Sequence, residues 1–211
     1  MAKIICLANS RKHGGSCVAG IDLQTEQWVR PVYAVSSMGL SFETRAINGR
    51  EPALLEVLEI PFEPSAPNPH GFQPENRLLG DGPWRRVGRV EARALLRVCE
   101  KPDVLLGNAG DRIGYSAINK LAVHRRRSLC LVHARNFTVE HVDREDRRPQ
   151  WRAHFDYGGR ILTKGLVITD GDAEARLEAG ETPARECILT ISLGEPWEGY
   201  CYKLVAGIVE L

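Results

Sequence analysis

The sequence lacks a large excess of charge of either sign and any long hydrophobic run. Its 28 lysines and arginines nearly balance 27 aspartates and glutamates, which leaves a formal net charge of +1. No strong overall field therefore attracts nucleic acid or an anionic membrane surface. No stretch approaches the length of a transmembrane helix, so we expect no membrane partner. Any basic binding surface must be built locally.

Paired cysteines are also missing. The six cysteines, at positions 6, 17, 99, 130, 187 and 201, form no Cys-x-x-Cys pair. This spacing matches neither a zinc site nor a compact disulfide framework. Histidine pairs at metal spacing and a Walker lysine pattern are absent as well, so we expect no cofactor and no metal. The chain starts Met1-Ala2-Lys3 and passes directly into a strand-like run, which predicts a cytoplasmic protein without a signal peptide.

Lysine is scarce beside arginine, with 6 lysines and 22 arginines. The planar guanidinium suits bidentate contacts with phosphate or carboxylate groups. A bias in codon usage would produce the same excess. Composition alone therefore does not decide between the two explanations.

Short strand patterns, separated by glycine and proline turns, account for most of the chain. The fold class we predict is mainly β with minor α, as two small barrels of the oligonucleotide-binding (OB) type in tandem. Residues 1–100 form the first predicted barrel, with a proline-rich crossing loop at 61–84. Residues 101–211 form the second, with short helices between strands and a capping helix at Asp172–Ala179. The pair Gly158-Gly159 predicts a hairpin turn.

Three blocks of sequence carry a resemblance to a known family. They are Ile4–Lys12 with Gly15 and Trp28–Pro31, then Gln73–Asn76, then Ser192–Ala206. With these blocks the chain resembles the bacterial family of dual OB-containing domain proteins, from Lys3 to the C-terminus. The resemblance implies two barrels that bind nucleic acid or nucleotide, and it supplies no catalytic residue.

The first candidate binding surface lies near the N-terminus. Arg11 and Lys12 precede two glycines, whose backbone amides can approach an anion closely. A solvated hairpin loop is the alternative. Trp28 and Arg30 alternate on the next strand, where a ring can stack on a base and a guanidinium can contact phosphate. The alternative is a core tryptophan and an internal ion pair.

Two further candidate surfaces follow in the second half. Residues 120–152 hold nine lysines and arginines against four aspartates and glutamates, and this excess lies close to aromatic residues. We expect backbone contacts from the arginine run and base stacking from nearby rings. On the last strand, two tyrosines alternate beside a lysine, either as a stacking face or as core residues. The candidate residues are Arg125, Arg126, Arg127, Tyr157, Tyr200, Tyr202 and Lys203.

These patterns favour a non-enzymatic module that binds single-stranded DNA or RNA, or a structured RNA, with affinity that falls steeply as salt is added. We expect no catalytic residue. Cys17 near His13 could in principle form a nucleophile and base, but a glycine turn is a poor setting for that geometry. Two alternatives stay open. One is a structural or adaptor subunit of a multi-protein assembly, such as a defence system, and the other is an enzyme that acts on a nucleotide.

Overall fold

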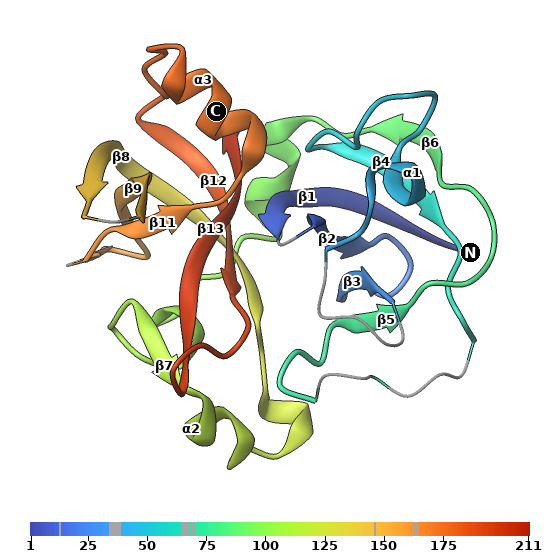
Figure 1. The fold of residues 1–211 in the computed structure, drawn as a ribbon, viewed down its shortest axis with the longest axis horizontal. Coiled ribbons are helices and arrows are strands. Elements are labelled where there is room, and N and C mark those ends of the chain that lie inside the picture. The colour runs from blue at the N-terminus through green and yellow to red at the C-terminus, as the bar shows by residue number, and fades with distance from the viewer. Residues whose placement is uncertain (13, 34–38, 65–67, 69–70, 146, 163) are drawn as a thin grey trace. The chain divides into compact units, whose positions relative to one another are not determined.

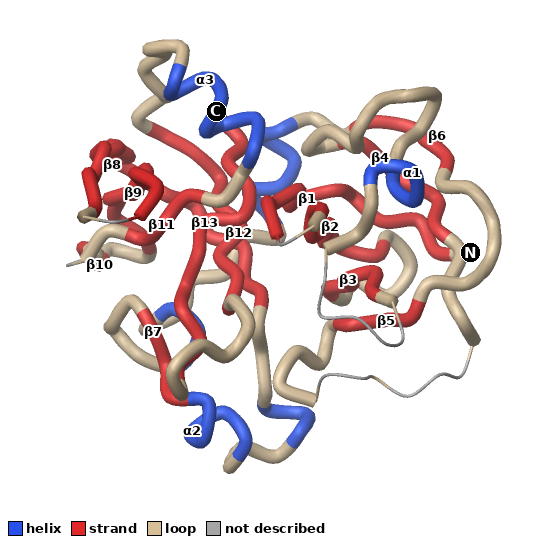
Figure 2. Tube along the Cα trace, viewed as in Figure 1, coloured by secondary structure: helices blue, strands red, loops and turns tan. Residues whose placement is uncertain are grey.

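The computed structural model describes residues 1–12, 14–33, 39–64, 68, 71–145, 147–162 and 164–211. These residues form two compact units, Met1–Glu91 and Ala92–Leu211, each with its own sheet (Figures 1 and 2). Among them, no helix is long and apolar enough to cross a membrane. The predicted domains 1–100 and 101–211 stay a prediction, while the compact units divide in the sequence between Glu91 and Ala92.

The six strands of unit 1 form one sheet that closes into a ring, accompanied by one short helix. Its elements are β1 (Ala2–Lys12), β2 (Gly15–Asp22), β3 (Trp28–Val32), α1 (Phe42–Arg45), β4 (Glu56–Ile60), β5 (Asn76–Leu78) and β6 (Arg85–Arg89). Strand β1 pairs antiparallel with β2 and β4, β2 pairs with β3, and β3 pairs parallel with β5. Strand β6 pairs with β4, and a bridge between Phe62 and Leu79 joins β5 to the end of β4. The segment from β5 to β6 thus serves as the fifth strand.

The core of unit 1 comes from one face of this ring. Ile4, Cys6 and Val18 point inward from β1 and β2, and Leu58 and Ile60 meet them from β4. Each of these side chains is fully buried. Burial of a leucine or isoleucine side chain contributes about 1.5–3 kcal/mol, so the ring is held mainly by apolar contacts.

Unit 2 contains a closed five-stranded barrel. Its barrel elements are β8 (Leu129–Arg144), β9 (Arg147–Tyr157), β11 (Leu166–Ile168), α3 (Gly171–Glu178), β12 (Glu186–Leu193) and β13 (Tyr200–Glu210). The remaining elements are η1 (Ala92–Arg97), η2 (Leu105–Gly107), β7 (Arg112–Gly114), α2 (Tyr115–Asn119), η3 (Val123–Arg125) and β10 (Arg160–Ile161). The ring runs β8-β9-β11-β13-β12 and returns to β8, with β11 and β13 parallel.

Both units share one chain topology. Three strands form a meander, a helix follows, and two more strands complete the ring, with the third and fifth strands parallel. This is the five-stranded Greek-key arrangement of the OB fold. The predicted mainly β fold with two OB-like barrels in tandem is therefore confirmed. The predicted turn at Gly158-Gly159 is present too, since both glycines have positive φ (54° and 79°) and join β9 to β10.

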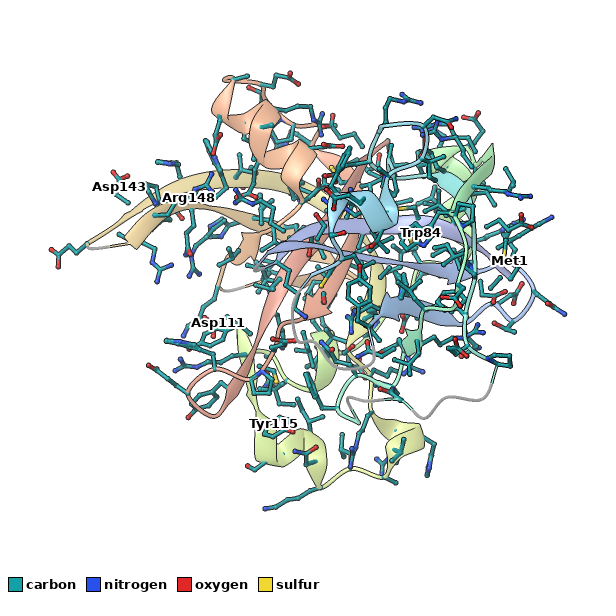
Figure 3. The ribbon with its side chains drawn as sticks, turned by 45° about the vertical axis from the view of Figure 1, so that its right-hand side comes forward. Met1, Trp84, Asp111, Tyr115, Asp143 and Arg148 are labelled. Carbon is teal, nitrogen blue, oxygen red and sulfur yellow. The ribbon has the colours of Figure 1, made fainter. Side chains whose placement is uncertain are left out.

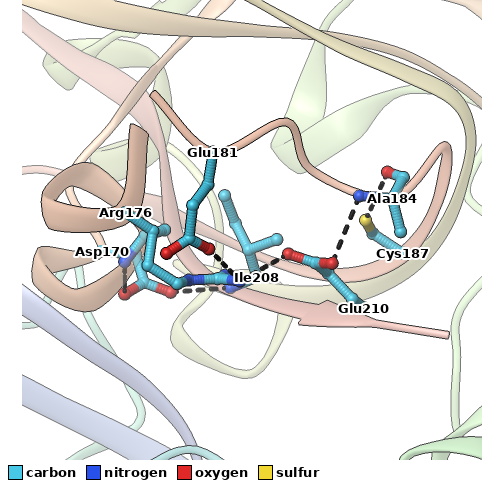
Figure 4. Close-up of polar contacts among 8 residues, drawn as sticks. Asp170, Arg176, Glu181, Ala184, Cys187, Ile208 and Glu210 are labelled. Atoms are coloured by element: carbon cyan, nitrogen blue, oxygen red, sulfur yellow. Dashed lines mark hydrogen bonds and ion pairs between the residues drawn. The ribbon is translucent and has the colours of Figure 1, made fainter. Parts of the chain in front are cut away.

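Helix α3 is attached to the barrel by polar contacts, of which those of Asp170 are buried (Figure 4). The Asp170 carboxylate caps the helix by accepting from the Ala173 amide at 3.1 Å, and it also accepts from the Ile208 amide at 2.9 Å. Burial raises the pKa of Asp170, although both amide contacts oppose that shift. At the other end of the helix, Arg176 contacts Glu210 at 2.7 Å. These contacts close the barrel end between the third and fourth ring strands.

Candidate functional site

A tight turn presents aromatic residues at the junction of β12 and β13. The backbone amides and carbonyls of Trp197 and Tyr200 bond to each other, at 2.8 and 3.0 Å. Glu198 and Gly199 between them have φ of 49° and 80°, as a type I′ hairpin turn requires. Because Trp197 and Tyr200 are directly paired, their side chains share one face. Their exposed fractions are 38% and 42%.

Strand β7 adds a cation to that face. Arg112 pairs with Tyr202 across the β7–β13 ladder. Its guanidinium carbon lies 4.5 Å from the centroid of the Tyr200 ring and 5.5 Å from that of Tyr202. Arg112 Nη1 also donates to the Tyr202 hydroxyl at 2.9 Å, and this bond raises the pKa of Arg112 further. We call Arg112, Trp197, Tyr200 and Tyr202 the Arg112 cluster.

Lys203 fixes the segment that carries Arg112. Its side chain points to the inner side of the barrel wall, with 2% of its surface exposed. The ammonium donates to the Asn108 carbonyl at 2.6 Å, the Asn108 side-chain oxygen at 2.8 Å and the Gly110 carbonyl at 2.7 Å. Burial lowers the pKa of Lys203 to about 8. Three acceptors match the three ammonium hydrogens, so the irregular segment 108–110 before β7 is held against β13.

The outer face of the barrel continues from the Arg112 cluster across three strands. Arg152 of β9, Val167 of β11 and Leu204 of β13 lie in one register row. Tyr202 follows on the same face, two residues from Leu204 on β13. Neighbouring strands are about 4.8 Å apart, so Arg152 and the cluster are separated by about two strand spacings and one side-chain repeat. The row forms a path from the aromatic residues to β9.

The β8–β9 hairpin extends this path beyond the barrel. Figure 3 shows Asp143 and Arg148 at the hairpin tip, away from Asp111 and Tyr115 beside β7. Arg148 contacts Glu178 at 3.3 Å, and Arg144 donates to Gln150 at 3.0 Å. Both arginines are exposed. The hairpin therefore supplies guanidinium groups at the end of the path opposite the cluster.

In unit 1, the predicted cations lie in two different settings. Arg11 is exposed and Lys12 is half-buried, both at the β1 end of the β1–β2 hairpin, while His13 lies outside the described residues. Trp28 is half-buried on β3. Arg30 is 4% exposed and donates to the Asn76 side chain at 3.1 Å. Segment Gln73–Asn76 therefore covers Arg30, which argues against direct contact of Arg30 with a ligand.

The three consecutive arginines have three different surroundings. Arg126 donates to the carbonyls of Leu121 and Asn119, each at 2.9 Å, and so caps the end of α2. Arg127 contacts Glu100 at 2.8 Å. Arg125 is exposed at the end of η3. A joint role of the run in nucleic-acid binding stays a prediction.

The predicted aromatic residues and Lys203 also lie in different surroundings. Tyr200 and Tyr202 belong to the Arg112 cluster, whereas Tyr157 is 5% exposed and packs beside Phe155 in the barrel. Lys203 is buried and donates to two main-chain carbonyls and to the Asn108 side-chain oxygen, so a contact with phosphate would require it to leave all three acceptors. Sequence reasoning missed Arg112 and Trp197. The dipeptide Glu198-Gly199 is a turn signal that could have placed Trp197 opposite Tyr200.

Metal-ligating side chains do not cluster in the described part of the chain, and three of its cysteines have raised pKa values. It contains no group of three or more histidine, cysteine or acidic side chains that could hold a metal ion. Burial raises the pKa of Cys99 and Cys201 to about 11 and that of Cys187 to about 12. These thiols are protonated near neutral pH, and a protonated thiol is a weak nucleophile.

Comparison with known proteins gives one match. A family model described as a dual OB-containing domain matches residues 2–208. The match spans both units and includes the Arg112 cluster. No curated protein and no solved structure matches the chain.

Proposed function

The chain belongs to the family of dual OB-containing domain proteins, and on that basis we propose that unit 2 binds single-stranded nucleic acid at the Arg112 cluster. OB folds bind oligonucleotides on the face of their second and third strands and on the loops between strands 1–2 and 4–5. In unit 2 these parts are β9 and β11, the β8–β9 hairpin and the turn at Trp197–Tyr200. The cluster lies at that last turn.

One observation carries the proposal: exposed rings and a guanidinium share one face at the position where this fold binds its ligands. Tyr200 and Trp197 are large aromatic residues that a folded protein more often buries. Each base stacked on such a ring contributes about 1–3 kcal/mol, and Arg112 adds a cation–π contact. Stacking needs an accessible base face, so single strands are favoured over duplexes.

Charge around the cluster refines the binding mode. Acidic residues lie beside the cluster in the sequence: Asp111 precedes Arg112, and Glu195 and Glu198 flank Trp197. Phosphate contacts are therefore better placed toward Arg152 and the hairpin arginines Arg144 and Arg148. In this arrangement the bases stack at the cluster and the backbone runs along the register row toward β9. Arg11 and Lys12 of unit 1 are proposed as a second phosphate-binding surface.

Fluorescence anisotropy with labelled dT12 and U12 oligonucleotides tests the proposal. We expect Tyr200→Ala and Trp197→Ala each to weaken binding at least about fivefold, from the loss of one stacked base. Phe42→Ala is the matched control, since Phe42 is 43% exposed but belongs to unit 1, and it should leave binding within about twofold.

Three results would contradict the proposal. The first is equal affinity for a duplex of the same length. The second is binding that neither aromatic substitution changes. The third is no oligonucleotide binding by a chain that purifies with a stoichiometric protein partner, a result that would favour the adaptor role.

A further inference from the structure

A separate cavity of about 200 Å³ lies in unit 2, between the start of β8, the end of β12 and the helical segments from η2 to η3. Its floor is formed by Cys130 and Leu193 of the barrel, both nearly fully buried. An engineered apolar cavity of about 150 Å³ is large enough to hold benzene. The volume here is therefore sufficient for one aromatic ring or a short alkyl chain.

Most of the lining is apolar. In addition to the floor, the walls are formed by side chains of η2, β7 and α2, with Leu121 and Val104 at the mouth. The apolar lining residues are Pro102, Val104, Leu106, Ile113, Ile118, Leu121, Cys130 and Leu193. Water gains few hydrogen bonds in such surroundings, so an apolar group is the favoured occupant.

Three charged side chains lie at the edge: Glu100, Arg125 and Arg127. Arg127 and Glu100 neutralise each other in an ion pair of 2.8 Å. Within the described residues, no carboxylate lies at ion-pair distance from Arg125. The cavity therefore has one excess positive charge at its mouth, carried by Arg125, and this charge complements a single anionic group.

One wall is built from unusual backbone. Leu106 has φ 44° and ψ 47°, a left-handed conformation that is unfavourable for leucine. Gly107 follows with φ 101°, and a Cβ at this position would lie 2.9 Å from Ile113 Cδ1. Strained backbone persists where the surrounding structure enforces it, and it is concentrated at ligand-binding sites. Here it positions Leu106 in the cavity wall and lets Ile113 close the side.

We propose that this cavity binds a small organic carboxylate, with its aromatic ring or medium-length alkyl chain between Leu106, Ile118 and Leu193 and its carboxylate on Arg125. The binding is distinct from nucleic-acid binding at the Arg112 cluster. The apolar floor recognises the body of the ligand, and the guanidinium recognises the charge. Phosphate alone, without an apolar body, leaves the floor unfilled and binds weakly.

Titration of the ¹⁵N-labelled full chain with 4-ethylbenzoate and, separately, with octanoate tests the proposal by amide chemical shifts. We expect saturable shifts at Gly107, Ile113 and Cys130 with a Kd of about 0.1–1 mM for at least one of the two acids. The acid that binds more tightly shows whether the cavity prefers an aromatic ring or an alkyl chain. Arg125→Gln should weaken this binding about tenfold through loss of a charge-assisted hydrogen bond. Arg97→Gln, an exposed arginine outside the cavity, should leave it unchanged.

A substitution that fills the cavity gives a second, independent test of the proposal. Leu121→Trp places a larger ring at the mouth and should abolish binding, whereas Val123→Trp, at a 60% exposed position that does not line the cavity, should not. The proposal is overturned if neither acid gives saturable shifts. It is equally overturned if Leu121→Trp still binds, or if 4-ethylbenzyl alcohol and 1-octanol bind as tightly as the two acids.

Discussion

Lys203 Nζ and Asn108 make two hydrogen bonds, one to the carbonyl oxygen at 2.6 Å and one to the side-chain oxygen at 2.8 Å. Asn108 in turn donates from its side chain to the Arg112 carbonyl at 2.9 Å. A buried side chain of the barrel is thereby linked to the strand that holds the guanidinium over Tyr200. Lys203 was predicted to contact nucleic acid directly, but this geometry favours a positioning role.

Replacement of Lys203 by methionine keeps the side-chain length and removes the ammonium. Three oxygens of Asn108 and Gly110 then lose their donor, so we expect about 3 kcal/mol of destabilisation at pH 7. Segment 108–112 should also loosen. Urea unfolding measures the first effect, and amide hydrogen exchange of β7 measures the second. Unchanged exchange in β7 would contradict the positioning role.

The same lysine predicts a pH dependence of stability. Its pKa is lowered from 10.5 to about 8 by burial, so between these values the unfolded chain binds more protons than the folded chain. The contribution of Lys203 to stability therefore rises with pH over this window, by up to about 3 kcal/mol, and does not change with pH well below pH 8. The difference in unfolding free energy between wild type and Lys203→Met, measured from pH 7 to 10, isolates this contribution. A difference that is flat or falls with pH would contradict the lowered pKa.

The barrel architecture could be predicted from the sequence because strands and turns are specified locally. The pair Gly158-Gly159 predicted a hairpin turn, which the structure confirms. Alternation placed Tyr200 and Tyr202 on one face, as the ladder shows. These features depend on neighbours within a few residues, which a sequence pattern records directly.

The partners of the candidate residues could not be predicted, because they come from distant parts of the chain. Arg112 reaches Tyr202 across 90 positions, and Lys203 reaches Asn108 across 95. Arg30 looked like a surface cation until Asn76 was placed against it by the parallel β3–β5 pairing. Residue type alone does not separate a guanidinium on the surface from one that holds two strands together.

Gly15 gives a prediction for unit 1. The sequence suggested that its amide contacts an anion, but a Cβ at this position would lie 2.1 Å from the Leu40 carbonyl oxygen. Gly15→Ala must therefore push segment 39–40 away from β2, at a cost of about 2–3 kcal/mol. Hydrogen exchange should rise in β1 and β2 and stay unchanged in β12.

The matched control for that change is Gly88→Ala. A Cβ at Gly88 would meet Val57 at 3.7 Å, an ordinary contact, and the backbone is not left-handed. The loss of glycine freedom in the unfolded chain should make this variant as stable as wild type or slightly more stable. Equal protection in both alanine variants would mean that the contact with Leu40 is unimportant.

The salt dependence of nucleic-acid binding separates stacking from phosphate contact. The three arginines proposed to contact phosphate, Arg144, Arg148 and Arg152, predict a slope of about −2 for log K against log salt on a single strand. Affinity should then fall about 20-fold from 50 to 200 mM salt, a weaker dependence than a fully basic groove gives.

Removing one phosphate contact with Arg148→Gln should reduce the slope by about 0.7. Tyr200→Ala should lower affinity at every salt concentration and leave the slope unchanged, because a neutral ring releases no counterions. Anisotropy titrations at four salt concentrations measure both quantities. A changed slope in Tyr200→Ala, or an unchanged slope in Arg148→Gln, would show that the bases and the phosphates do not lie as proposed.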